Sequence, residues 1–256
     1  MQNLKNNIKN RLFQALRNKF ENYKPETSSM PFHTRLLGKD RMALYSFIQS
    51  LNTNFGTSIF EPVAEELAKA HFDKIERQKS AGEYIRKHAQ IQIQEIMDSL
   101  ESGNSKPNKT MEIARILNLQ GGELSKVKPT KVDLFLQKNN DVYLIDIKTA
   151  KPNKGGFKEF KRTLLTWVGC FGLNNPNAKI NSLIAIPYNP YEPKPYERWT
   201  MAGMLDLDFE LKVAEEFWDF LGGTGSYELI LSAFEEVGQE MREEIDEYFE
   251  RFNRNE

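Results

Sequence analysis

The sequence predicts an α/β fold, in which a mixed β-sheet core is flanked by helices, with an α-helical N-terminal region and C-terminal helices. Two short apolar strands, Val132–Gln137 and Val142–Lys148, flank the polar residues 138–141 and together predict a β-hairpin. A continuous apolar run, Lys179–Pro187, predicts a central strand that is buried on both faces. Helical spacing of apolar residues occupies much of the remaining chain.

The chain length of 256 residues allows one substantial core, and we expect a single domain with three regions. These are a mainly helical region (1–110), a catalytic α/β core (111–203) and an acidic helical C-terminal region (204–256). No apolar run approaches the roughly 20 residues that cross a bilayer, and the N-terminus has no signal-peptide core. We therefore expect a cytoplasmic protein without a membrane partner.

Four helices are predicted before the hairpin: Leu4–Phe20, Asp40–Leu51, a helix that starts near Glu61 and Pro62, and Tyr84–Leu100. Ser58 is expected to cap the third of them, and proline favours a first helical turn. The segment 101–110 (ESGNSKPNKT) is expected to be a flexible connection. Residues 111–119 are predicted to form a short strand or a helical turn.

After the hairpin, a helix is predicted from about Phe157, its apolar part holding the single cysteine, Cys170, in the core. The strand 179–187 ends in a loop, YNPYEPKPYERW, that is rich in proline and aromatic residues. From Glu210 the chain is predicted to be helical, and its last helix is Tyr227–Phe252. Loops that follow sheet strands often carry function, so this proline-rich loop is a candidate recognition element, although a purely structural loop explains it equally well.

The charge distribution favours an anionic partner even though the net charge is only −1. Residues 204–256 hold 16 acidic and 4 basic side chains (net −12), so residues 1–203 hold 31 basic and 20 acidic ones (net +11). Between Lys148 and Arg162 there are six basic residues against one acidic residue, Glu159. Lys126, Lys128 and Lys131 also give the hairpin's first strand a basic approach.

The predicted hairpin brings three charged side chains together. If residues 138–141 form the turn, Gln137 pairs with Val142, and the pairing then places Asp133 opposite Asp146. Lys148 shares a face with Asp146, because side chains alternate along a strand. Two opposed carboxylates repel each other, and a divalent cation such as Mg²⁺ removes this repulsion. A lysine beside them can orient or deprotonate an attacking water and neutralise charge on phosphorus.

At these residues the chain resembles the PD-(D/E)xK nucleases, and within them the type II restriction endonucleases. Asp133 corresponds to the first acidic residue, and Asp146-Ile147-Lys148 to the second motif. Val132 stands where the family often has proline, and Asp146 stands where glutamate is commoner. Neither difference removes a metal ligand. The segments DIKTAKPN and FKEFKRTLLTW further resemble a subfamily that cuts GGNCC.

The resemblance implies a restriction-endonuclease-like core, Mg²⁺ as cofactor and double-stranded DNA as substrate. Both strands would be cut at a short palindrome, which a two-fold symmetric homodimer meets most simply. Asp133 and Asp146 would bind the metal and Lys148 would act on water and phosphate. Members of the family often add a glutamate from the preceding helix, for which Glu61 is our first choice and Glu65 the second. A carboxylate that only stabilises a helix's first turn explains Glu61 equally well.

Seven basic residues are predicted to contact DNA: Lys151, Lys154, Lys158, Lys161, Arg162, Lys194 and Arg198. A solvated basic surface is the alternative interpretation of the first five. Other functions also stay open at this point. They are a structure-specific or repair nuclease of the same fold, a DNA-binding module with a decayed site, and a hydrolase with an acid/base carboxylate pair. Lys148 disfavours the last, since a cation there keeps both carboxylates ionised.

Overall fold

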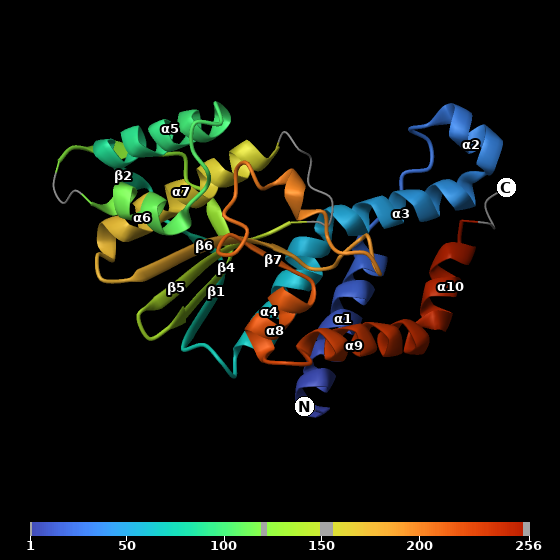
Figure 1. Cartoon of the computed structure of the whole chain (residues 1–256). Coiled ribbons are helices and arrows are strands. Elements are labelled where there is room, and N and C mark those ends of the chain that lie inside the picture. The colour runs from blue at the N-terminus through green and yellow to red at the C-terminus, as the bar shows by residue number, and fades with distance from the viewer. Residues whose placement is uncertain (1, 119–121, 149–155, 253–256) are drawn as a thin grey trace. The chain divides into compact units, whose positions relative to one another are not determined.

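A computed structural model of the chain describes residues 2–118, 122–148 and 156–252. These residues divide into two compact units, Met1–Glu66 with Gly225–Glu256, and Leu67–Thr224. The C-terminal helices therefore belong with the N-terminal helices, and the second unit contains the hairpin (Figure 1). Among the described residues, no helix is long and apolar enough to cross a membrane.

The first unit is helical, as the sequence predicts for the N-terminal region. Its elements are α1 (Gln2–Asn22), α2 (Pro31–Leu37), α3 (Lys39–Phe55), a π-helical turn (Gly56–Phe60), the start of α4 (Glu61–Ala68), α9 (Ser226–Glu240) and α10 (Arg242–Glu250). The predicted N-cap at Ser58 is wrong, because Ser58 lies inside the π-helical turn that joins α3 to α4. The predicted last helix is divided at Met241 into α9 and α10.

The acidic C-terminal helices pair with the basic face of α1 inside this unit. Lys9 contacts Glu236 at 2.9 Å and Glu240 at 2.5 Å, and Arg17 contacts Glu244 at 2.7 Å. Hydrogen bonds from Lys5 and Lys9 lower the pKa of Glu236 to about 2. Three acidic residues of the C-terminal region, Glu236, Glu240 and Glu244, are thus paired with cations of the first helix.

The second unit is an α/β core, which confirms the predicted fold class. A five-stranded mixed sheet has the order β1-β4-β5-β6-β7, and a two-stranded sheet pairs β2 with β3. The strands are β1 (Lys74–Ser80), β2 (Tyr84–Arg86), β3 (Leu124–Lys126), β4 (Lys131–Lys138), β5 (Asp141–Ile147), β6 (Lys179–Ile186) and β7 (Leu211–Val213). Its helices are α5 (Lys87–Glu101), α6 (Lys109–Leu117), α7 (Gly156–Asn174) and α8 (Glu215–Gly222), with a 3-10 turn at Arg198–Thr200.

Several local predictions differ from this structure. The predicted helix 84–100 begins with the short strand β2, because residues 84–86 pair with β3. Within the segment 111–119, residues 111–117 belong to α6, whose N-cap Asn108 accepts a hydrogen bond from the Met111 N–H at 2.9 Å. The region from Glu210 onward was expected to be entirely helical, but Leu211–Val213 forms an edge strand beside β6. Cys170 is buried, as predicted.

Helix α7 covers one face of the sheet, with α5 and α6 packed outside it (Figure 1). The Phe171 ring of α7 lies 5.6 Å from the Phe135 ring of β4, and Ser182 of β6 donates a hydrogen bond to the Leu164 carbonyl at 3.0 Å. On the opposite face, Phe220 of α8 lies 5.0 Å from Tyr143 of β5. The central strands are therefore buried on both sides, which agrees with their apolar sequences.

Candidate active site

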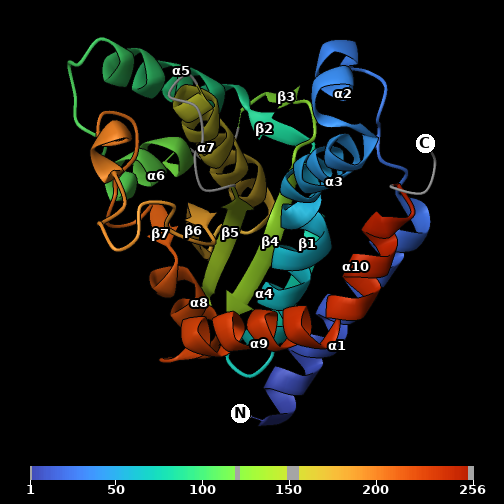
Figure 2. The same cartoon turned by 90° about the vertical axis from the view of Figure 1, so that its right-hand side faces the viewer.

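The hairpin has the register that the sequence predicts. Strands β4 and β5 run antiparallel, with Gln137 opposite Val142, and Figure 2 shows them side by side. Continuing this register places Asp133 opposite Asp146 on the face that α7 covers. The turn itself is tighter than expected, because Lys138 and Asp141 pair with each other and residues 139–140 alone connect the strands. The predicted register is nevertheless correct, because the tighter turn still pairs Gln137 with Val142.

Hydrogen bonds from two neighbouring strands fix the Asp133 carboxylate. The backbone N–H of Ile147 donates to Oδ2 at 2.8 Å, and the side-chain amide of Gln78, on β1, donates to Oδ1 at 3.1 Å. Each oxygen keeps a further lone pair, so it can still bind a metal ion. Gln78 is not predictable from the sequence, because it lies on the polar edge strand β1, which has no apolar pattern that marks a strand.

Asp146 and Lys148 form a close ion pair beside Asp133. The Lys148 ammonium lies 2.6 Å from Asp146 Oδ1, and Asp146 is only 6% exposed. The Lys148 backbone N–H donates to the Ala185 carbonyl of β6 at 2.9 Å, and its ammonium lies 5.2 Å from the centre of the Phe160 ring. The lysine is thus held between the sheet and the N-terminal half of α7.

Burial and, to a smaller extent, the nearby Asp133 carboxylate raise the pKa of Asp146 to about 7 against the opposing effect of Lys148. A perturbed carboxyl of this kind is typical of functional sites. Both carboxylates supply hard oxygen ligands, which suit Mg²⁺, and an ion of this type usually completes its shell with water and substrate phosphate. In the described ranges no cluster of three or more His, Cys, Asp or Glu side chains could hold a metal. The donor set therefore fits Mg²⁺ on two carboxylates rather than a closed structural site.

Glu61 and Glu65 lie on α4, as predicted. Glu61 is the first residue of that helix and is 1% exposed, while Glu65 is half-buried. A third acidic residue of the same helix, Glu66, accepts hydrogen bonds from Asn7 and Arg11 of α1. The predicted place of Glu61 or Glu65 beside the metal stays a prediction, because both belong to the first unit and the hairpin to the second.

Lys161 is not on the surface, so the prediction that it contacts DNA is wrong. Its side chain is fully buried and lies 2.5 Å from Glu112 of α6 and 2.6 Å from Glu210. Lys109 completes this buried ion cluster, with its ammonium 2.8 Å from Glu210 and 2.6 Å from the Ser182 hydroxyl. We call these four ionised residues the buried ion cluster. It joins α6 and α7 to the sheet and leaves no charge for a phosphate.

The other predicted DNA contacts have different surroundings. Lys158 is exposed and pairs with Glu101 at 2.8 Å, and Arg162 is half-buried and donates to Gln94 at 3.0 Å. Lys194 is exposed, whereas Arg198 pairs with Glu216 at 2.6 Å. Lys151 and Lys154 lie outside the described residues. The DNA contacts proposed for all six residues stay predictions.

An open polar groove of about 540 Å³ lies between α5, α7 and the segment that leads into β4. Among the described residues that line it, the cations are Lys126, Lys128 and Arg162, and the one carboxylate is that of Glu159. Neither Lys126 nor Lys128 forms an ion pair within the described part of the chain, and both are exposed. The remaining lining residues are Ile85, Gln90, Ile93, Gln94, Val127, Thr130, Thr163 and Thr166. We call this feature the α5–α7 groove.

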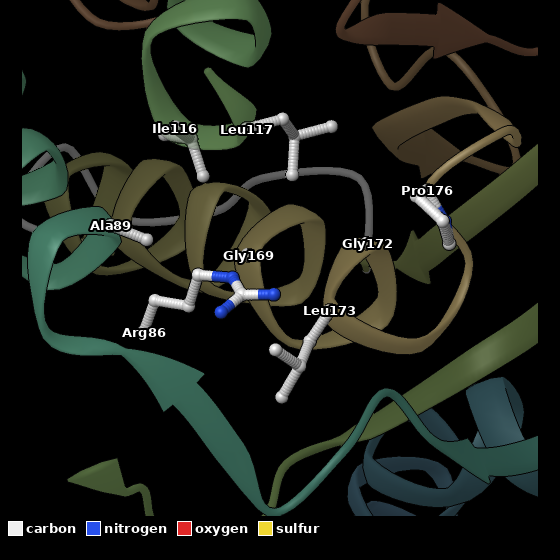
Figure 3. Close-up of a pocket in the computed structure, with 8 residues that line it drawn as sticks. All are labelled: Arg86, Ala89, Ile116, Leu117, Gly169, Gly172, Leu173 and Pro176. Atoms are coloured by element: carbon white, nitrogen blue, oxygen red, sulfur yellow. The ribbon is translucent and has the colours of Figure 1, made fainter. Parts of the chain in front are cut away.

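The α5–α7 groove adjoins the hairpin along the chain. Thr130 lines it and is followed directly by β4, three residues before Asp133. Its hydroxyl accepts a hydrogen bond from the Trp167 indole of α7 at 2.7 Å, which fixes the wall of the groove to that helix. A second pocket, of about 120 Å³, lies along the C-terminal half of α7 (Figure 3). Apart from Arg86 its lining is apolar, and it contains no predicted site residue.

The fold and the hairpin together define a class of protein. The mixed sheet flanked by helices is consistent with the restriction-endonuclease-like fold. Its hairpin brings two aspartates and a lysine close together. The buried and perturbed Asp146 marks the same place as the candidate catalytic centre.

Comparison with known proteins gives the family. The family model "Type II restriction endonuclease, HinfI" matches residues 1–238, and the chain belongs to that family. The type II restriction enzyme MjaII of Methanocaldococcus jannaschii is 26% identical over 240 residues, which cover 82% of this chain and 63% of MjaII. The type II restriction enzyme HgiCII of Herpetosiphon aurantiacus is 24% identical over 220 residues, covering 84% of this chain and 80% of HgiCII. The chain thus spans less than two thirds of the length of MjaII.

Proposed function

We propose that the chain is a Mg²⁺-dependent type II restriction endonuclease that hydrolyses phosphodiester bonds in both strands of double-stranded DNA at a short palindrome. The observation that carries this proposal is the convergence of Asp133 and Asp146 with the Lys148 ammonium, 2.6 Å from Asp146. Membership of the HinfI family supports the same reaction. The segments DIKTAKPN and FKEFKRTLLTW resemble a subfamily that cuts GGNCC, and this resemblance supports GGNCC as the palindrome.

Each residue of the hairpin has a separate role in the proposed reaction. Asp133 and Asp146 would hold Mg²⁺, which when bound supplies positive charge against the phosphate and acidifies a water ligand. The Lys148 ammonium would orient the attacking water and neutralise the charge that develops on the phosphate oxygens. Asp146 is buried, and in the low dielectric constant around it each electrostatic contact is stronger than in water.

The α5–α7 groove is where we propose that the DNA backbone lies next to the catalytic hairpin. Three cations against one carboxylate suit a phosphate chain, and the exposed Lys126 and Lys128 have no acidic partner in the described residues to displace. Its glutamine and threonine side chains can donate hydrogen bonds to phosphates or base edges. Lys158, Arg162 and Lys194 are proposed to add phosphate contacts, together with Lys151, Lys154 and Arg198.

A palindromic target supports a homodimer as the active form, because one two-fold axis then relates both the two strands and the two catalytic centres. We propose this assembly without assigning its interface. Sedimentation of the protein with and without a palindromic duplex measures the stoichiometry. One chain per duplex would contradict the proposal.

The test of the function is incubation of the purified chain with bacteriophage DNA in Mg²⁺ or in EDTA, followed by gel electrophoresis. Discrete bands in Mg²⁺ alone are expected, and sequencing of the ends then tests GGNCC. A smear would indicate a non-specific or structure-specific nuclease. Intact DNA under both conditions, with DNA retained by the protein, would indicate a binding module.

A further inference from the structure

The edge strand β1 has an irregular backbone at one residue. It pairs antiparallel with β4, and the pairs Arg77 with Leu134 and Lys79 with Val132 hold the register on both sides of Gln78. Gln78 itself has φ 53, a left-handed conformation that residues other than glycine rarely adopt. The register places this residue opposite Asp133, the first of the two candidate metal ligands.

A second left-handed residue in the same sheet provides the comparison. Asn139 also has φ 53, but it lies in the two-residue turn of the hairpin, where such a conformation is required to reverse the chain. At Gln78 the chain does not reverse, since β1 continues paired on both sides. Turn geometry therefore does not explain the conformation of Gln78.

The position of the Gln78 side chain offers an explanation. Its amide donates to Asp133 Oδ1 at 3.1 Å, while the Ile147 N–H donates to Oδ2 at 2.8 Å. The carboxylate is thus held at both oxygens, by β1 on one side and by β5 on the other. Without the Gln78 bond, the Asp133 carboxylate is held at one oxygen only. It can then rotate away from the Asp146 carboxylate, which repels it.

We propose that Gln78 is a positioning residue that holds Asp133 in the orientation required to share a metal ion with Asp146. This inference rests on the proposed metal-dependent function and assigns to it a residue outside the acidic motif. Groups that orient a metal-binding carboxylate commonly change metal affinity or activity by about 10–100-fold when they are removed. A residue with an unfavourable backbone conformation next to a catalytic group is a recurring feature of functional sites.

The test compares Gln78→Gly with Gln78→Ala, because glycine adopts a left-handed backbone without strain and alanine does not. We expect Gln78→Gly to melt about 2–4 °C higher than Gln78→Ala. Both variants nevertheless lose the amide donor. We expect both to bind Mg²⁺ alone, titrated by calorimetry, about 10–100-fold more weakly than the parent chain, with the same loss in cleavage rate at fixed Mg²⁺. The affinity for duplex DNA in EDTA stays unchanged.

Asn139→Gly is the matched control, since it relaxes the same backbone conformation at the other end of the hairpin. It should gain thermal stability and keep the parent chain's Mg²⁺ affinity. The proposal is overturned if Gln78→Gly binds Mg²⁺ and cleaves like the parent chain, or if the parent chain binds no Mg²⁺. A parent chain that binds Mg²⁺ but leaves DNA intact instead contradicts the proposed function, and the Mg²⁺ titrations still decide the role of Gln78.

Discussion

The second unit holds two groups of carboxylates and lysines that differ in their burial and in their charge balance. In the buried ion cluster, two lysines face two glutamates, and each of the four side chains is at most 7% exposed. On the hairpin, the described residues bring two carboxylates, Asp133 and Asp146, together with one ammonium, that of Lys148, which contacts Asp146 and whose side chain is 32% exposed. One group is neutral and closed, and the other carries excess negative charge and opens to solvent.

This difference separates a structural arrangement from the one that we propose to be catalytic. In the buried ion cluster each charge already has a partner, so a ligand would gain nothing by binding, and removal of one member leaves an unpaired buried charge. On the hairpin the unbalanced carboxylate is a reason to bind a cation. Burial is the main cause of the raised pKa of Asp146, and the neighbouring Asp133 carboxylate adds to it, whereas a bound cation would oppose both effects.

Lys148→Ala is expected to have the largest effect on function. It removes the ammonium that contacts Asp146, and we expect cleavage to fall by at least about 10²–10³-fold while DNA affinity in EDTA is kept. Asp133→Ala should also abolish cleavage. Rates from a supercoiled plasmid and affinities from fluorescence anisotropy measure the two quantities. Cleavage retained in the Asp133 variant would contradict the metal assignment, and loss of folding in the Lys148 variant would make that lysine structural.

Lys161→Ala is expected to have the opposite profile, a large loss of stability. It leaves Glu112 and part of Glu210 buried without their cation, which should lower the free energy of unfolding by about 3–5 kcal/mol. Urea unfolding measures this value. Arg162→Ala, at the next position of α7, is the control and should change it by less than about 1 kcal/mol, as is usual for substitutions outside the core. Equal losses of unfolding free energy in the Lys161 and Arg162 variants would contradict a structural role of the buried ion cluster.

Lys161 also shows what the sequence could and could not predict. The hairpin register followed from strand alternation and turn position alone, so the places of Asp133, Asp146 and Lys148 were predictable. The partners of Lys161 were not, because Glu112 and Glu210 are 49 residues away along the chain on either side. A lysine in a basic run resembles its exposed neighbours until the packing of α6 against α7 is known.

The same limit applies to the edges of the sheet. Strand β7 has only three residues, and β1 consists mostly of polar residues, so neither has the apolar pattern by which a buried strand is identified. Gln78 was missed for this reason. Its role depends on a backbone conformation and on a partner 55 residues away, and no local pattern encodes either.

The pH dependence of stability should distinguish Asp146 from the neutral cluster. Its pKa in the folded protein, about 7, lies above the ordinary value of 3.8, so the folded protein binds this proton more tightly than the unfolded chain does. In EDTA the stability that this group contributes is therefore lost as the pH rises from about 4 to about 7. We expect a loss of ~2 kcal/mol between pH 5 and pH 8 in urea unfolding, absent in Asp146→Asn. Parallel pH profiles would contradict the assignment.

The smallest expected effect concerns the surface that leads to the hairpin. Lys126 and Lys128 line the α5–α7 groove without an ion pair in the described residues, so a phosphate can take either lysine without first breaking a bond. Replacing both by alanine should make the slope of log affinity against log salt less steep by about 1.8, since each phosphate contact contributes about 0.9.

The matched control uses Lys138 and Lys179, which are also exposed but lie at the turn end of the hairpin. Their double alanine variant should keep the slope of the parent chain. The slope depends on the number of phosphate contacts and not on the stability of the protein. Equal slopes in the two variants would therefore contradict the proposal that DNA lies in the α5–α7 groove, but would not affect the assignment of the hairpin residues.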